Sequence, residues 1–344
     1  MKAVFAARAR RLAPQLAALL AIVALNAAIS PNFLDVTVQN GRLYGSLIDI
    51  LNRGAPVALL AIGMTLVIAT KGIDLSVGAV MAICGAIAAS LAADGTPLPI
   101  ALGVSLFVGL LCGLWNGILV AFLKIQPIIA TLILMVAGRG IAQLVTEGVI
   151  LTFNVPGFAF LGSGSLLGLP TPVIIWIATG LLVGLTVRRT ALGLLIEAIG
   201  INRRASALVG VRTHSLILVV YMVSGLCAAL AGLIVTADIR GADANNAGLW
   251  LEPDAILAVV IGGTSLLGGR FSILASLIGA MIIQAVNTGI LITGFPPEFN
   301  LVIKAGIIIL ILMIQSPVVA TAISYVRLAR SPAGERLQGR PARR

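Results

Sequence analysis

Long apolar runs with few or no charges dominate this sequence. The first reaches from Leu12 to Ile29, and nine more lie at about residues 54–70, 75–93, 98–123, 125–145, 171–187, 215–237, 254–268, 272–293 and 301–320. A hydrocarbon core of about 30 Å needs about 20 consecutive apolar residues in a helix, because each residue adds about 1.5 Å. We therefore predict an all-α fold, a polytopic transmembrane bundle of about ten helices.

The composition excludes a water-soluble fold. Hydrophobic residues make up 59% of the chain and charged residues 10%, whereas soluble domains carry about 25% charged residues. The segments between the apolar runs are also too short to build a separate core. Residues 1–344 are therefore expected to form a single transmembrane domain in a lipid bilayer.

The net charge of +11 predicts membrane orientation rather than nucleic-acid binding. Basic residues gather near both ends of the chain and in the segment 188–214, and the runs between them carry few charges. Lys and Arg are typical of cytoplasmic loops. We therefore expect both termini in the cytoplasm, a basic tail at about 321–344 on an anionic leaflet, and no nucleic-acid partner.

The first apolar run has an alternative interpretation as a secretory signal peptide. Four bases precede it, namely Lys2, Arg8, Arg10 and Arg11. The run from Leu12 to Ile29 is longer than the about 7–15 apolar residues of a signal peptide, and further spans follow it. An uncleaved first helix is the interpretation we favour.

Motifs for enzymatic chemistry are missing from the sequence. There is no GxxxxGK[ST] loop, the usual device for holding nucleotide phosphates. The single histidine, His214, lies in a basic loop, and the three cysteines lie far apart inside apolar runs, at Cys84, Cys112 and Cys227. We expect no enzymatic activity, no metal site and no cofactor.

Polar and small residues inside the apolar runs are the remaining local signals. Asp74 lies between two runs in the string Lys71-Gly72-Ile73-Asp74-Leu75-Ser76-Val77-Gly78, and charge at such places commonly marks function. We expect Asp74 and Ser76 to be helix N-caps, with a proton-relay carboxylate as the alternative. A glycine every fourth residue predicts close helix packing, at Gly109, Gly113 and Gly117.

The loop at about 188–214 is the most informative segment. Gly200 is expected to end one short helix, and Asn202 to cap a second helix that stops at Gly210. The second helix, about two turns long, has one apolar and one basic face. It would either lie on lipid headgroups or be pushed by another protein.

Three strings in this order resemble the permeases of ribose/galactose-type ABC sugar importers. They are the Gly72–Gly78 string, the loop Gly193…Glu197-Ala198-Ile199-Gly200…Asn202…Gly210, and the segment 258–270 with its Gly-Gly-Thr-Ser-Leu-Leu-Gly-Gly-Arg ending. The segment 238–250 is similar to the subgroup that imports galactofuranose. One departure is Pro253 in Glu252-Pro253-Asp254, where the family usually has leucine; proline is tolerated at the first position of a helix.

The resemblance implies a permease that a separate cytoplasmic ABC ATPase subunit drives and a periplasmic sugar-binding protein supplies. It further implies a bacterial inner membrane and a second permease subunit, of the same or a different chain. The loop residues expected to couple to the ATPase are Gly193, Glu197, Gly200, Asn202, Arg203, Arg204 and Gly210.

Further expectations concern the sugar and its binding protein. Polar and aromatic residues within spans are candidates for the translocation path, with helix-helix hydrogen bonds as the alternative role; they are Trp115, Asn116, Gln284, Asn287 and Thr288. The acids Asp238, Asp243, Glu252 and Asp254 are expected to dock the binding protein, with an ordinary solvated loop as the alternative. The rival functions are an ion-coupled secondary transporter of a small polar solute and a passive channel.

Overall fold

The structure is a computed structural model that describes residues 2–39, 41–294 and positions 301, 302, 305, 306, 309 and 313. The first half of these residues forms α1 (Lys2–Ile29), β1 (Thr37–Gln39), β2 (Arg42–Tyr44), α2 (Ser46–Arg53), α3 (Ala55–Ala69), α4 (Val77–Ala93), α5 (Leu98–Ala121), α6 (Pro127–Val145), β3 (Leu151–Thr152) and α7 (Pro156–Ser163). The second half forms β4 (Ser165–Leu166), β5 (Leu169–Pro170), α8 (Thr171–Arg189), α9 (Leu192–Leu208), α10 (Thr213–Ile239), β6 (Gly241–Ala242), α11 (Leu251–Ile261) and α12 (Ile273–Ile292). Most of the run at 301–320 and the basic tail at 321–344 lie outside the described residues.

The structure confirms the predicted fold class, a helical polytopic membrane protein. Six helices are long and apolar enough to cross a membrane, namely the Leu12–Ile29 part of α1, then α5, α6, α8, α10 and α12. Helices α2 and α3 are long and apolar enough only when taken together, and they meet at a bend of 45°. The runs at 75–93 and 254–268 form α4, of 17 residues, and α11, of 11 residues. The described chain therefore has fewer full crossings than the ten apolar runs suggested.

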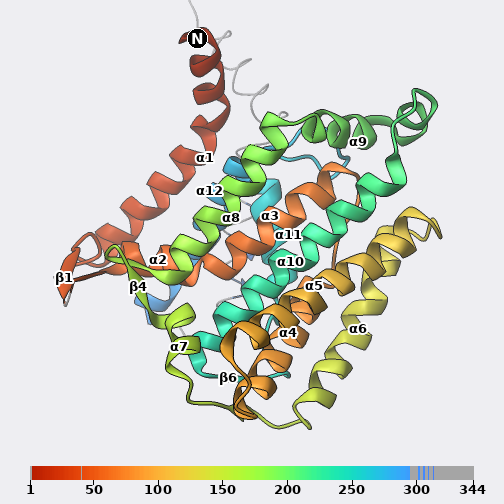
Figure 1. The fold of residues 1–344 in the computed structure, drawn as a ribbon. Coiled ribbons are helices and arrows are strands. Elements are labelled where there is room, and N and C mark those ends of the chain that lie inside the picture. Colours follow the sequence, from red (N-terminus) through yellow and green to blue (C-terminus); the bar gives the residue numbers. More distant parts are fainter. Residues whose placement is uncertain are drawn as a thin grey trace, which may run out of the picture.

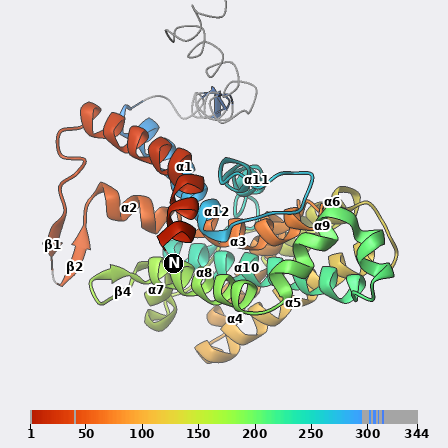
Figure 2. The same ribbon diagram turned by 90° about the horizontal axis from the view of Figure 1, so that it is seen from above.

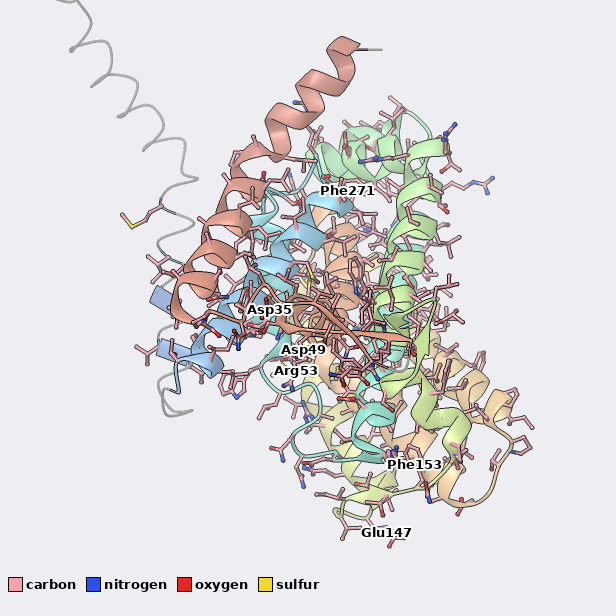
Figure 3. All side chains as sticks on the ribbon, turned by 90° about the vertical axis from the view of Figure 1, so that its left-hand side faces the viewer. Asp35, Asp49, Arg53, Glu147, Phe153 and Phe271 are labelled. Carbon is pink, nitrogen blue, oxygen red and sulfur yellow. The ribbon has the colours of Figure 1, made fainter. Side chains whose placement is uncertain are left out.

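The helices run between two ends of the bundle (Figure 1). One end, here named the α9 end, holds α9 and the start of α1; the other, the β6 end, holds β6 and α7. The labelled side chains mark the same two ends: Phe271 lies near α9, and Phe153 and Glu147 lie at the β6 end (Figure 3). Short antiparallel strand pairs join segments at or towards the β6 end, with Leu151 opposite Ala242 in one of them.

Helix α3 is the centre of the core. All fifteen of its residues are buried, as expected for a helix that is apolar on every face. Seen from above, α3 lies between α12 on one side and α10 on the other (Figure 2), and it packs against both. The short, fully buried α3 is thus surrounded by protein.

The glycine stripe of α5 confirms the predicted close packing. A Cβ at Gly109 would stand 2.5 Å from the Cβ of Ala229, and one at Gly117 would stand 3.0 Å from the Cα of Leu218. Both neighbours belong to α10, as does Tyr221, whose carbonyl oxygen faces Gly113. Only glycine lets the α5 and α10 backbones approach so closely.

Helix α1 is tied to the bundle by two buried amides. Gln15 Nε2 donates to the carbonyl oxygen of Gly262 at 3.3 Å, and Asn26 Nδ2 donates to that of Ala285 at 2.9 Å. These two bonds join α1 to the end of α11 and to α12.

Candidate functional site

Helix α9 is bent at the position where the sequence predicted two helices. Asn202 leaves helical geometry, with φ −151° and ψ 96°, and its Oδ1 accepts a hydrogen bond of 3.0 Å from the backbone N–H of Ala205. Gly210 follows the second part with a φ of +89°, which costs glycine little. The predicted cap at Asn202 and stop at Gly210 are therefore confirmed.

Gly200 has a different role from the predicted helix end. It stays helical, and the first part of α9 continues through it to the bend. A Cβ on Gly200 would collide with the carbonyl oxygen of Ala69 and would lie 2.5 Å from the backbone nitrogen of Gly269. That nitrogen itself donates to the Ala69 carbonyl at 2.9 Å. Close approach of three backbones, rather than a positive φ, therefore requires glycine here.

Two cations fix the bend against the bundle. Lys71 Nζ donates to the carbonyl oxygen of Ile201 at 3.1 Å, and Arg203 Nη2 donates to that of Ala121 at 3.0 Å. The turn after α3 and the end of α5 are thus bonded directly to α9. Among the other predicted coupling residues, Arg204 is exposed and Glu197 is partly buried. A Cβ added at Gly193 would lie 2.6 Å from the carbonyl oxygen of Val187, so this position also has room only for glycine.

Asp74 is the hub of a buried hydrogen-bond network. Its Oδ1 accepts bonds from Ser76 Oγ at 2.6 Å and from the Ser76 backbone N–H at 3.1 Å. Its Oδ2 accepts a bond of 2.8 Å from Ser224 Oγ in α10. Ser76 occupies the N-cap position of α4 but makes no side-chain cap bond there. Asp74 thus satisfies a backbone N–H just before α4, as expected of a capping residue, whereas Ser76 does not cap the helix with its side chain. The bond from Ser224 adds a link from this segment to α10.

The candidate path residues lie on two helices, α5 and α12. Asn116 Nδ2 donates to Ser76 Oγ at 2.8 Å, so Asn116 belongs to the Asp74 network, as its alternative role predicted. Trp115, also on α5, is 52% exposed in the described chain. Gln284, Asn287 and Thr288 lie together on α12, and Gln284 Nε2 lies 3.5 Å from Thr288 Oγ1.

A cavity of about 330 Å³ with a mixed polar and apolar lining lies where α2, α10 and α12 approach the β6 end. Gln284 and Asn287 line it, together with Asn52 and Arg53 of α2 and Asp238 of α10. The Oδ1 atoms of Asn52 and Asn287 are buried and have no hydrogen-bond partner among the described residues. Sequence reasoning missed Asn52 and Arg53, because they lie just before an apolar run and carry no motif.

Two of the four acids that were predicted to dock the binding protein are buried. Glu252 and Asp254 are each only 6% exposed, and a Cβ on Gly78 would collide with the Glu252 carboxylate. The segment before them turns into the bundle, because Arg139 Nη1 donates to the carbonyl oxygens of Ala244 and Ala247. Glu252 and Asp254 are therefore buried in the described fold, whereas the prediction placed them on an exposed docking surface.

Asp238 and Asp243 remain accessible. Asp243 Oδ1 accepts bonds from the backbone N–H groups of Asn245 and Asn246 at 3.1 and 3.2 Å. Its Oδ2 accepts a bond of 2.7 Å from Asn246 Nδ2. The side-chain bond from Asn246 is the main cause that lowers the pKa of Asp243. The carboxylate is therefore held ionised in a fixed turn.

Comparisons of the sequence with known proteins find related permeases. A family described as branched-chain amino acid transport system / permease component matches residues 46–312. The chain is 63% identical to the galactofuranose transporter permease protein YtfT of Escherichia coli K12 over 314 residues, 91% of this chain and 92% of that protein. It is 43% identical to the fructose import permease protein FruF of Bifidobacterium longum, covering 81% and 80% of the two chains. It is 38% identical to the ribose import permease protein RbsC of E. coli K12, covering 88% and 92%. No solved structure matches the chain. The extent of these matches shows that the chain belongs to the branched-chain amino acid transport system / permease component family, as a transporter subunit and not an enzyme.

Proposed function

We propose that this chain is the permease subunit of an ATP-driven importer of galactofuranose or a related monosaccharide. A separate ABC ATPase subunit acts on the bent α9, a periplasmic sugar-binding protein delivers the sugar, and a second permease subunit completes the pathway. The observation that carries this proposal is the backbone contact of Gly200 with Ala69 and Gly269. Because these contacts join backbone to backbone, a displacement of α9 would be transmitted to α3 and to the segment before α12 without passing through a flexible side chain.

The proposed orientation puts the α9 end in the cytoplasm and the β6 end on the periplasmic side of the bacterial inner membrane. Two bases, Lys71 and Arg203, are bonded around the bend of α9. The segment 189–213 adds further bases next to them, as is typical of the cytoplasmic side. Both termini would then lie in the cytoplasm, with Asp238 and Asp243 facing the binding protein.

The cavity at the β6 end suits a neutral, hydroxyl-rich ligand. Asn52, Gln284 and Asn287 offer uncharged amides, each of which both donates and accepts hydrogen bonds. The unpartnered Oδ1 atoms of Asn52 and Asn287 are acceptors that sugar hydroxyls would satisfy. We therefore propose this cavity as the entry of the sugar path, with the polar face of α12 as its wall.

Transport in proteoliposomes tests the proposal. Full-length permease, its ATPase and its binding protein are reconstituted together, and the uptake of radiolabelled galactofuranose is compared with that of ribose and fructose. We expect uptake that needs ATP and the binding protein and that prefers galactofuranose. Uptake driven by a proton gradient without the ATPase would overturn the proposal in favour of an ion-coupled secondary transporter, for which Asp74 would be the carboxylate to examine.

A further inference from the structure

A second cavity, of about 490 Å³, lies at the α9 end beside the bend. Its wall comes from the turn after α3, the loop between α5 and α6, the bend of α9 and the first turns of α10. Its volume falls within the about 300–1,000 Å³ of small-molecule sites. It is separate from the proposed sugar cavity, and it shares no lining residue with it.

Three cations line this cavity, Lys71, Lys124 and Arg203, and among the described residues no acidic side chain does. The carbonyl bonds of Lys71 and Arg203 orient these cations but leave their charges unneutralised. Lys71 and Lys124 both have positive φ values, 65° and 56°, so each lies on a tight turn that the fold fixes. The cavity therefore concentrates positive charge on a preformed frame.

Neutral donors supplement the three cations. Thr70, Gln126 and Asn202 line the same cavity, and so does Tyr221, which is fully buried. The Tyr221 hydroxyl has no hydrogen-bond partner among the described residues. An unpartnered buried phenol is costly to the protein, and an acceptor oxygen on a bound ligand would satisfy it.

We propose that this cavity binds a phosphate-bearing ligand, either a sugar phosphate from solution or the headgroup of an anionic phospholipid. A phosphate group has several strong acceptor oxygens and pairs well with arginine and lysine. The volume leaves room for a polyol beside the phosphate, within reach of Thr70, Gln126 and Asn202. Because Arg203 and Asn202 also form the bend of α9, an occupied site would hold the bend in one geometry.

Binding to the full-length protein tests this inference and requires no transport. The protein is placed in nanodiscs of phosphatidylcholine alone, and glucose 6-phosphate is titrated by calorimetry, with glucose as the uncharged control. In a second arm the nanodiscs contain phosphatidylglycerol, and retained lipid is counted by native mass spectrometry. Binding of glucose 6-phosphate but not glucose supports the soluble ligand, and selective retention of phosphatidylglycerol supports the lipid.

Neighbouring arginines supply a matched pair of variants. Arg203→Gln and Lys124→Gln each remove one charge from the wall, whereas Arg204→Gln removes a charge next to it on the exposed side of α9. We expect the first two variants to weaken binding of the ligand by roughly three- to tenfold, since each removes one charged donor to the phosphate at a partly exposed position. Arg204→Gln should bind like the parent. The inference fails if neither ligand binds, or if Lys124→Gln and Arg204→Gln bind it equally well.

Discussion

Ser224 Oγ, near the middle of α10, donates a hydrogen bond of 2.8 Å to Asp74 Oδ2, although 150 residues separate the two in the chain. Both side chains are at most 1% exposed. The bond joins α10 to the segment before α4, and through Ser76 it extends to Asn116 of α5. Three elements are therefore held in register by one carboxylate.

Ser224→Ala is expected to destabilise the protein by about 1–3 kcal/mol, because it leaves Asp74 Oδ2 buried without this donor. Thermal unfolding in detergent measures the effect. Ser105→Ala is the matched control: Ser105 is also buried, but its Oγ donates to the Ala101 carbonyl of its own helix. Equal losses in both variants would show that the bond between α10 and Asp74 carries no special weight.

Gly200→Ala is expected to separate α9 from α3. The added methyl group meets backbone atoms of Ala69 and Gly269, which cannot rotate away as a side chain can, and overpacking of this kind costs about 1–3 kcal/mol. ATP hydrolysis stimulated by the loaded binding protein should fall, while membrane insertion persists. Gly184→Ala on α8, where a Cβ meets nothing within 4 Å, should leave stimulation unchanged. Normal stimulation in Gly200→Ala would remove this contact from the coupling route.

Asn287→Ala is expected to raise the KM for sugar by about three- to tenfold, the loss of one or two neutral hydrogen bonds. Its stability should change little, because the deleted Oδ1 has no partner among the described residues. Initial uptake rates at varied sugar concentration separate KM from maximal rate. Trp115→Phe, on the exposed side of α5, should transport like the parent. A larger KM change in Trp115→Phe than in Asn287→Ala would place the path elsewhere.

Asp243→Asn is expected to slow docking of the binding protein and to flatten the dependence of the docking rate on salt, since exposed charges act mainly on association. The effect should be modest at about 0.15 M salt, where screening limits its reach to about 8 Å. Surface plasmon resonance over a salt series measures it. Asp94→Asn removes an exposed charge from the turn between α4 and α5, towards the same end, and serves as the control. Identical salt slopes for the parent and Asp243→Asn would exclude Asp243 from the docking surface.

The turn at Asp243 is also expected to resist acid. Bonds from Asn246 lower the pKa of this carboxyl below its ordinary 3.8. A lowered pKa in the folded state stabilises the turn above pH 3.8 and loses that contribution only as the pH falls through the lower folded value. Hydrogen exchange at the Asn245 and Asn246 amides should therefore stay protected on acidification to the ordinary pKa and decline below it. Loss of protection well above pH 3.8 would contradict the lowered pKa.

The sequence predicted what depends on local chemistry. Apolar runs located the long helices, and Asn202 and Gly210 bounded the second part of α9, because capping and positive φ involve neighbours along the chain. It could not predict contacts between distant segments. Gly200 looked like a helix end because the backbones it touches, at Ala69 and Gly269, are more than 60 residues away in either direction.

The acids before α11 illustrate the same limit for the candidate site. Glu252 and Asp254 follow a polar loop, so their sequence indicates exposure, yet Arg139 of α6 draws the preceding backbone into the bundle. Hydropathy also could not distinguish a full crossing from the shorter α4 and α11, since a buried helix of less than spanning length is as apolar as a spanning one. Asn52 and Asn287 line the same cavity only because α2 packs against α12, a contact that the sequence does not reveal.

The complete burial of α3 has a consequence for the response to the bilayer itself. At fifteen residues, α3 is about 22 Å long, too short on its own for a hydrocarbon core of about 30 Å. Because protein rather than acyl chains surrounds it, this shortfall creates no hydrophobic mismatch. Changes in lipid chain length should therefore tilt the outer helices, such as α5 and α6, while α3 and its contact with Gly200 keep their geometry. A thicker or thinner membrane would therefore alter the lipid-facing outer helices of this transporter before it altered the buried α3.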